Sequence, residues 1–159
     1  MTLQPALAQR LKFLVRVVRK ERQHLNMTDQ RMFQAEFTAA QAAQLESNPE
    51  LAERLDAFVG RFARLQDTLG DKLLPALLTA MGEKASSVID NLDRAERLGW
   101  LKSVDEWLTI RELRNQMIHE YIEDPVVLSS ALQAGHAFIA TLNATADRMI
   151  AEIERRGWA

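Results

Sequence analysis

The chain has 159 residues, of which 47% are hydrophobic and 26% charged, with no cysteine and a formal net charge of -2 at pH 7. This length and composition predict one globular domain over residues 1–159 and exclude disordered and fibrous classes. The absence of cysteine excludes disulfides, thiolate metal sites and cysteine nucleophiles, and the small net charge means that any contact with RNA must come from a local basic patch.

The first residues, Met1 to Pro5, lack the basic segment, apolar core and cleavage site of a signal peptide. No uninterrupted apolar run approaches the roughly 18 residues of a membrane span. We therefore expect a cytoplasmic protein that makes no membrane contact. Pro5 suits the first turn of a helix, and His24 is expected near the end of that helix. Its apolar stripe recurs at steps of three and four residues and comprises Leu3, Leu7, Leu11, Leu14, Val18 and Leu25.

This first helix carries a basic run between Arg10 and Arg22. Within it, Lys12, Arg16 and Arg19 fall on one helical stripe. Such a stripe is typical of the solvated face of an amphipathic helix, and it is also the pattern of a surface that guides RNA. Both interpretations stay open, and the three residues form a candidate RNA-contact set.

The segment from residue 26 to residue 47 is less regular, with short helices expected to start at Thr28 and at Thr38, where Gln41 completes a capping box. Asn48 followed by Pro49 then predicts the start of a long core helix. Pro75 removes a backbone donor, so we expect a kink or an end near residues 71–74.

Three more helices complete the prediction. One runs from Ser86-Ser87 to about Leu98, the next begins at Ser103 or Asp105, and Asp124-Pro125 starts the last. No strand-like alternation occurs between them. The pattern predicts an all-α antiparallel helical bundle with four to five main helices.

The most informative segment lies near the end of the penultimate helix and reads Arg114-Asn115-Gln116-Met117-Ile118-His119-Glu120-Tyr121. It combines a fixed cation, an imidazole and a phenol, which are the parts of a metal-free phosphodiester site. On an ideal helix Arg114 and His119 are separated by about 140° of rotation, whereas Arg114 and Tyr121 nearly eclipse. We therefore expect a second copy of the helix, across a twofold axis, to complete the site.

The pattern Arg114-x4-His119-x-Tyr121 resembles the signature of HEPN domains, specifically the HepT-like toxin of the HEPN/MNT toxin–antitoxin pair. The segment Arg64-Leu65-Gln66-Asp67-Thr68-Leu69-Gly70-Asp71-Lys72-Leu73-Leu74-Pro75 is also similar to the second-helix region of these proteins. The resemblance covers the chain from about Asn48 onward.

The resemblance implies a homodimeric, metal-independent endoribonuclease toxin that needs no cofactor and is neutralised by a nucleotidyltransferase-fold (MNT) antitoxin. His119 would take the proton of a ribose 2′-hydroxyl, Arg114 would bind the phosphate, and Asn115 would orient either group. An imidazole in water has a pKa of about 6.5, which suits this role near neutral pH. In the family the tyrosine, here Tyr121, is the site at which the antitoxin attaches AMP.

The same residues also have structural explanations. Arg114 could pair with a carboxylate such as Asp67 on the long helix, His119 could cap the end of its helix, and Tyr121 could pack against the bundle. Asp67 is accordingly only a candidate supporting residue. Two alternatives to the toxin follow: a non-catalytic subunit that binds nucleotide or RNA beside a nucleotidyltransferase, and a helical dimer with a purely structural role.

Overall fold

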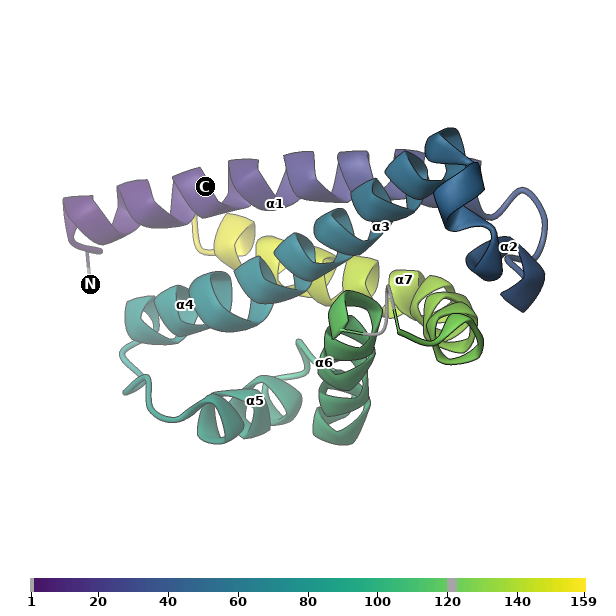
Figure 1. The fold of residues 1–159 in the computed structure, drawn as a ribbon. Helices are drawn as coiled ribbons and strands as arrows, with labels where there is room; N and C mark the ends of the chain where they lie inside the picture. The colour runs from purple at the N-terminus through teal and green to yellow at the C-terminus, as the bar shows by residue number, and fades with distance from the viewer. Residues whose placement is uncertain (1, 120–122) are drawn as a thin grey trace.

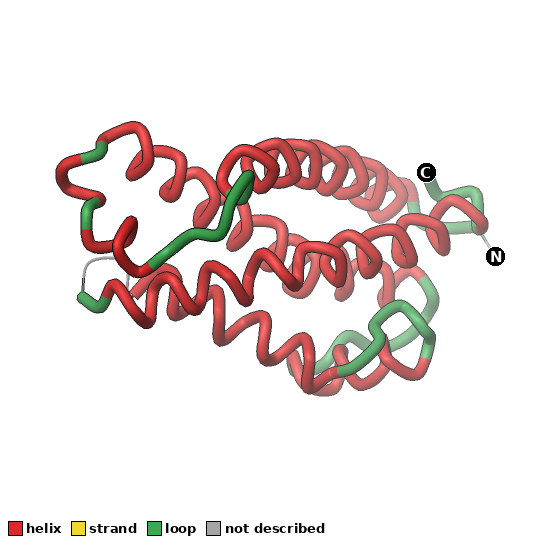
Figure 2. The backbone as a smooth tube through the Cα atoms, turned by 90° about the vertical axis from the view of Figure 1, so that its right-hand side faces the viewer, coloured by secondary structure: helices red, strands yellow, loops and turns green. Residues whose placement is uncertain are grey.

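The computed structural model describes residues 2–119 and 123–159, and every regular element in these two ranges is helical (Figures 1 and 2). The prediction of an all-α bundle is confirmed. In chain order the elements are α1 (Pro5–Met32), α2 (Ala39–Ala43), η1 (Leu45–Ser47), α3 (Pro49–Asp67), η2 (Thr68–Leu73), α4 (Leu74–Ala80), α5 (Val88–Arg97), α6 (Val104–His119) and α7 (Pro125–Arg155).

Helix α1 is longer than the sequence pattern predicted. It passes His24 and ends at Met32, so the expected separate helix at Thr28 is wrong. The reason is that Leu25, Thr28 and Met32 continue the buried stripe at steps of three and four residues. Buried Thr28 also accepts a hydrogen bond from Arg61 of α3, which ties this end of α1 to the bundle.

The capping signals for α2 and α3 are confirmed. Thr38 and Gln41 form the expected capping box, in which the Gln41 amide donates to Thr38 Oγ1 at 3.2 Å. Asn48 caps α3 by accepting from the Leu51 amide at 3.2 Å, and Pro49 follows it in the first turn. These caps satisfy backbone donors that the first turn of a helix leaves unpaired.

The irregularity predicted just before Pro75 is present as the π-helical turn η2, and the helix continues beyond it as α4. Figure 1 shows α3 leading into α4 as one nearly continuous rod, and the two are joined by the π-helical turn η2. In this turn the Leu74 amide donates to the Leu69 carbonyl five residues back. The wider turn absorbs Pro75, which lacks a backbone N–H and would otherwise clash with a carbonyl of the preceding turn.

Two glycines and two serines determine where the chain leaves one helix and starts the next in the connections from α4 to α5 and from α5 to α6. Gly82 and Gly99 have φ values of 80° and 82°, a left-handed backbone that suits the residue after a helix end. Ser87 caps α5 through the Asp90 amide at 3.2 Å. Ser103, rather than Asp105, caps α6, because its Oγ accepts from the Glu106 amide at 3.2 Å.

Helix α7 begins at the cap formed by Asp124, as predicted, and it is the central helix of the bundle. An 18-residue window of α7 reaches a mean hydropathy of 1.3, so by length and composition the helix could cross a membrane, and 39% of that window is buried here. The helix packs against several others, above all α6 and α2. Its buried residues are Leu128, Ser129, Ala131, Leu132, Gly135, Ile139, Leu142, Thr145, Ala146, Met149, Ile150 and Ile153.

Candidate functional site

Two close contacts fix the position of α6, the helix that carries the Arg114 segment. Trp107 lies over Gly70 of the π-helical turn so closely that a Cβ on Gly70 would be 3.3 Å from the indole Nε1. About half a turn before its end, α6 places Met117 against Gly135 of α7, where a Cβ would be 3.2 Å from the Met117 methyl carbon. Because both side chains are buried, α6 is docked rigidly across α3 and α7.

Arg114 lies between these two anchors and reaches across to α3. Its Nη2 donates to Asp67 Oδ2 at 2.9 Å, and its Nη1 donates to Asn115 Oδ1 at 3.0 Å. The Arg114 Nε is buried and has no hydrogen-bond partner. The ion pair is partly open to solvent, since 29% of the Arg114 side chain and 39% of the Asp67 side chain are exposed. The structure therefore contains the ion pair with Asp67 that was considered as a structural explanation of Arg114.

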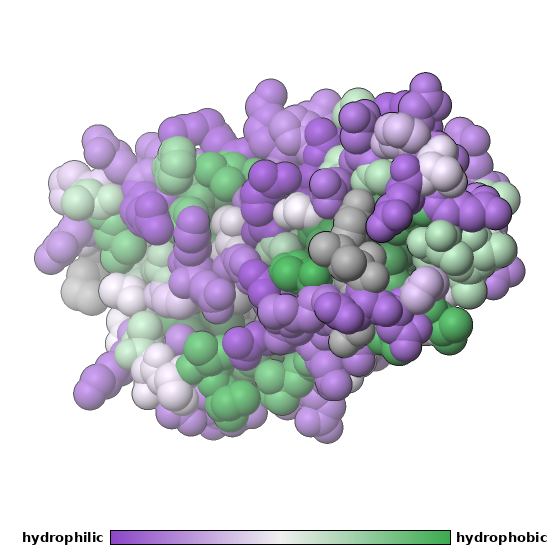
Figure 3. All heavy atoms as spheres, viewed as in Figure 1, coloured by the Kyte–Doolittle hydropathy of each residue, from purple (hydrophilic) through white to green (hydrophobic). Residues whose placement is uncertain are grey.

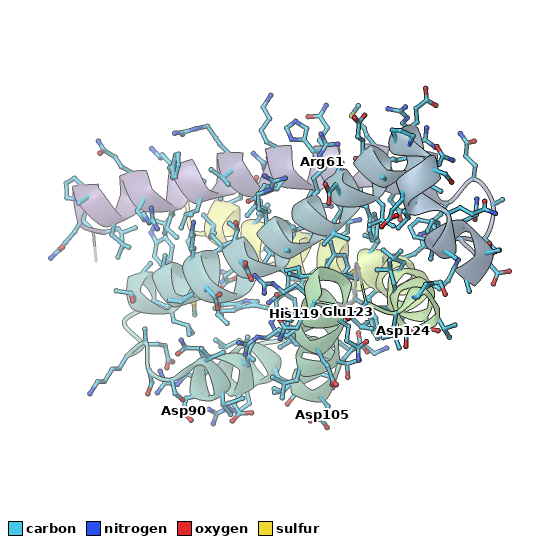
Figure 4. All side chains as sticks on the ribbon, in the orientation of Figure 1. Arg61, Asp90, Asp105, His119, Glu123 and Asp124 are labelled. Atoms are coloured by element: carbon cyan, nitrogen blue, oxygen red, sulfur yellow. The ribbon has the colours of Figure 1, made fainter. Side chains whose placement is uncertain are left out.

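The predicted catalytic residues are not all brought together within one chain. Asn115 and His119 are exposed, and the hydrogen bonds of Arg114 go to Asp67 and Asn115. Figure 4 shows His119 at the end of α6 that adjoins α3, with Glu123 beside it and Asp105 at the opposite end of the helix. This agrees with the expectation that Arg114 and His119 do not share a helix face.

Tyr121, the predicted modification site, lies outside the described residues. The described residues that flank it expose apolar surface: 41% of Ile118 and 63% of Val126 are open to solvent. Exposed aliphatic side chains next to a candidate site are typical of a surface that another protein covers. The sequence patterns did not indicate this pair, because neither residue belongs to an apolar stripe.

Asp67 is the last residue of α3 and stands directly before the π-helical turn. Turns of this kind are rare and occur often at functional sites. Here the turn carries Gly70 against Trp107 and places Asp67 beside Arg114, so one local distortion supports two contacts with α6. The candidate supporting role of Asp67 therefore has a geometric basis.

The three residues of the candidate RNA-contact set have different surroundings. Arg19 forms an ion pair with Glu154 near the end of α7. Arg16 lies with its guanidinium 6.0 Å from the centre of the Phe13 ring and lines a groove between α1 and α3. Lys12 is exposed. The three residues therefore do not act as one surface: Arg19 connects α1 to α7, and Arg16 lines the groove between α1 and α3.

The groove also contains functional candidates that the sequence did not reveal. Arg61 and Arg64 of α3 and Lys72 of η2 form the wall opposite Arg16. Glu21 of α1 lies among them, and burial raises the pKa of its carboxyl group above the usual range, against the opposing effects of the Thr68 hydrogen bond and the nearby cations. These residues are separated by about 40 positions, so no local pattern joins them.

Histidines outside the motif have structural roles. The Nδ1 of His136 lies 2.6 Å from Asp29 Oδ1, and its ring stacks on Phe33 with 4.2 Å between ring centres. His24 lines the basic groove, and its backbone carbonyl accepts from Arg61 at 3.3 Å. These contacts tie α1 to α7 and to α3.

No protein-family model matches the chain, and neither the curated proteins nor the solved structures contain a significant match.

Proposed function

We propose that the chain is a metal-independent endoribonuclease toxin that cleaves RNA at a cleft formed by two copies of its Arg114 segment. The observation that carries the proposal is the anchored guanidinium of Arg114, whose Nη2 lies 2.9 Å from Asp67 Oδ2, on the same helix that ends at the exposed His119. Cleavage of RNA by side chains needs a fixed cation for the phosphate and an accessible imidazole as the base, and α6 carries both.

The proposed chemistry begins with the ribose. A neutral His119 ring accepts the proton of the 2′-hydroxyl, and the 2′-oxygen attacks the adjacent 3′-phosphorus. The bond from phosphorus to the 5′-oxygen breaks, and this oxygen takes a proton from water, which leaves a 2′,3′-cyclic phosphate and a 5′-hydroxyl. Arg114 stabilises the charge that grows on the phosphate oxygens, because a guanidinium stays charged at every working pH.

Asn115 and Asp67 position Arg114 in this scheme. Asp67 holds Nη2, and the Asn115 amide oxygen holds Nη1. The Arg114 side chain is partly exposed, so in this scheme a phosphate that binds there replaces one of these contacts with its own oxygens. The bidentate geometry of a guanidinium suits this exchange.

A homodimer completes the proposed site. Arg114 does not contact His119 within the chain, and Ile118 and Val126 leave an apolar surface next to the motif. A twofold axis through this surface places the Arg114 segments of the two protomers opposite each other, because the same surface of each protomer forms an isologous interface. The proposed site then contains two sets of Arg114, Asn115 and His119.

Regulation belongs to the same proposal. A nucleotidyltransferase-fold antitoxin attaches AMP to Tyr121, and the added phosphate binds Arg114 in place of RNA. The proposal places toxin, antitoxin and RNA in the cytoplasm and includes neither a metal ion nor an organic cofactor.

Cleavage in the presence of a chelator tests the proposed function. Purified protein is incubated with a labelled single-stranded RNA in excess EDTA, and with the same sequence as DNA. We expect RNA products that end in a cyclic phosphate and no DNA cleavage, because only RNA supplies the attacking 2′-hydroxyl. Arg114→Ala and His119→Ala should each lower the cleavage rate about a hundredfold or more without loss of helicity.

The outcomes separate the alternatives. Equal cleavage by wild type and both variants would identify a contaminating nuclease. Binding of RNA without cleavage would favour the non-catalytic subunit, an alternative that the engagement of Arg114 by Asp67 also supports. If the protein neither binds nor cleaves RNA, the remaining alternative is a helical dimer with a structural role.

A further inference from the structure

The groove between α1 and α3 has a volume of about 840 Å³. Its size lies within the roughly 300–1,000 Å³ that ligand sites usually occupy. None of Arg114, Asn115 and His119 lines it. Figure 3 shows the surface in the same view as Figure 1, with hydrophilic residues crowded over α1 and apolar residues between them.

Five cationic side chains line the groove. Arg16 and Lys20 stand on α1, Arg61 and Arg64 on α3, and Lys72 on η2. Glu21 is the single carboxylate among the lining residues. The protein as a whole has a formal net charge of -2, so this concentration of positive charge is a local feature. Opposed cationic walls attract a polyanion and focus the field between them.

Most of these cations are available to a ligand. Arg61 is occupied, since it donates to the Thr28 hydroxyl and to the His24 carbonyl, and Figure 4 shows it on the α1 side of α3. Within residues 2–119 and 123–159, Lys20, Arg64 and Lys72 are exposed and have no hydrogen bond or ion pair to another side chain. The wall from Arg64 to Lys72 spans eight residues, about 12 Å along the helix.

The groove also offers a flat apolar surface. Phe13 is 47% exposed at its edge, and the Arg16 guanidinium lies 6.0 Å from the centre of its ring. An exposed aromatic ring beside cations is the usual platform for an unpaired base, because every base has a face that can stack. Phe13 and Lys20 are seven residues, or about 10 Å, apart on one face of α1.

One of the two carboxylate oxygens of Glu21 has no hydrogen-bond partner. Its Oε2 accepts from the Thr68 hydroxyl at 3.2 Å, whereas its Oε1 is buried and has no partner. Buried polar atoms are nearly always paired, so an acceptor of this kind calls for a donor. The hydroxyl of a ribose or the exocyclic amine of a base is such a donor.

We propose that the groove binds a short stretch of single-stranded RNA, with backbone phosphates between the walls formed by Lys20, Arg64 and Lys72 and one base stacked on Phe13. The spread of the cations along two helices suits an extended backbone better than a single compact phosphate. The choice of RNA as the ligand rests on the proposed ribonuclease function. The groove shares α3 with Asp67, so RNA bound in it lies next to the segment that holds Arg114.

RNA binding is measured by fluorescence anisotropy with a labelled, unstructured 12-nucleotide RNA in EDTA, in the His119→Ala background so that the strand stays intact. The groove variant is Arg64→Gln with Lys72→Gln. The matched control is Arg148→Gln with Lys102→Gln, two exposed cations outside the groove with the same change in charge. All four positions are exposed, and circular dichroism confirms that the helices remain.

We expect the groove variant to raise the dissociation constant at least tenfold above that of the control. The slope of log K against log salt should fall by about one or more, because each phosphate contact on a single strand contributes roughly 0.7. Phe13→Leu should weaken binding by about tenfold with the salt slope unchanged, since stacking is not an ionic contact.

Equal affinity of the groove variant and the control would overturn the proposal, even if cleavage still depended on Arg114. Displacement of the RNA by free AMP at equal nucleotide concentration would also overturn it, because that result identifies a mononucleotide site. If the wild-type protein cleaves no RNA and the groove variant loses RNA binding, the RNA site in the groove would be supported and the proposed nuclease activity refuted.

Discussion

The guanidinium of Arg114 on α6 and the carboxylate of Asp67 on α3 face each other with 2.9 Å between Nη2 and Oδ2, although 47 residues separate them in the chain. The contact lies at the crossing of the two helices and is partly open to solvent. An exposed ion pair adds at most about 1 kcal/mol to the free energy of unfolding. Its main effect is therefore to hold the Arg114 side chain in one orientation.

Asp67→Asn should lower RNA cleavage about tenfold, less than Arg114→Ala, because it releases the guanidinium without removing it. The double variant should be no slower than Arg114→Ala alone, since residues that act through one contact are not additive. Cleavage rates in EDTA provide the measurement. Asp71→Asn, an exposed carboxylate one turn further along, is the matched control. Additive losses would show that Asp67 acts independently of Arg114.

The protein should sediment as a dimer at micromolar concentration. Ile118→Lys or Val126→Lys should shift it toward the monomer, because a charge placed in the apolar surface beside the motif loses its hydration in the interface. Ile89→Lys, at an exposed aliphatic residue of α5, should leave the dimer intact. Analytical ultracentrifugation distinguishes the species. A wild-type monomer would remove the composite site.

Co-expression with a nucleotidyltransferase antitoxin should increase the mass of the intact chain in steps of one AMP and abolish cleavage. Tyr121→Phe should prevent both effects, because it keeps the ring and removes the acceptor oxygen. Mass spectrometry reads the result directly, since Tyr121 is the only tyrosine in the sequence. Modification of a serine or threonine, or full silencing of Tyr121→Phe, would show that the antitoxin masks the site without using this residue.

Glu21→Gln should stabilise the fold at neutral pH. Burial is the largest cause of the raised pKa of Glu21, and Asp67 adds to it, while the Thr68 hydrogen bond, Arg64 and Lys72 oppose it. A raised pKa means that the fold prefers the neutral carboxyl: this stability is complete below the usual pKa of 4.5 and is lost as the pH rises through the raised value. The melting temperatures of variant and wild type should therefore converge below pH 4.5 and separate above the raised pKa. A constant difference would contradict this assignment.

Alanine at two helical glycines should have opposite effects. At Gly60 the nearest atoms belong to the flexible end of Arg64, so Gly60→Ala should gain about 0.5–1 kcal/mol of helix stability. At Gly70 the new Cβ meets the buried ring of Trp107 at 3.3 Å, and Gly70→Ala should cost about 1 kcal/mol or more. Urea unfolding followed by tryptophan fluorescence gives both values. Equal gains would show that Trp107 moves freely.

The sequence predicted the helices well where local chemistry determines them. Asn48, Thr38 and Asp124 cap helices as expected, because a cap depends on side chains within three residues. At Pro75 it indicated an irregularity but not its form, because the form depends on whether the preceding turn can widen. It failed at Thr28, whose burial is supported by Arg61 from a distant helix.

The candidate site was predictable only in part. The spacing of Arg114 and His119 correctly indicated that they do not share a helix face, and Asp67 was anticipated as a partner of Arg114. The basic groove was not anticipated, since it combines α1 with positions about 40 residues later, and only the packing of α1 on α3 brings them together. A pattern within one helix identified Arg16 but not Arg64 or Lys72.

The π-helical turn at Thr68–Leu73 sets the angular phase between the two halves of the long helix. A single residue corresponds to about 100° of rotation on an α-helix, so removing one residue between Asp67 and Gly70 would turn the two residues to different sides of the long helix. Asp67, which binds Arg114, and Gly70, against which Trp107 packs, could then no longer both face α6. A change of one residue in the length of the turn between Asp67 and Gly70 should therefore break one of the two contacts with α6, and this constraint on length adds to the steric constraint on Gly70 itself.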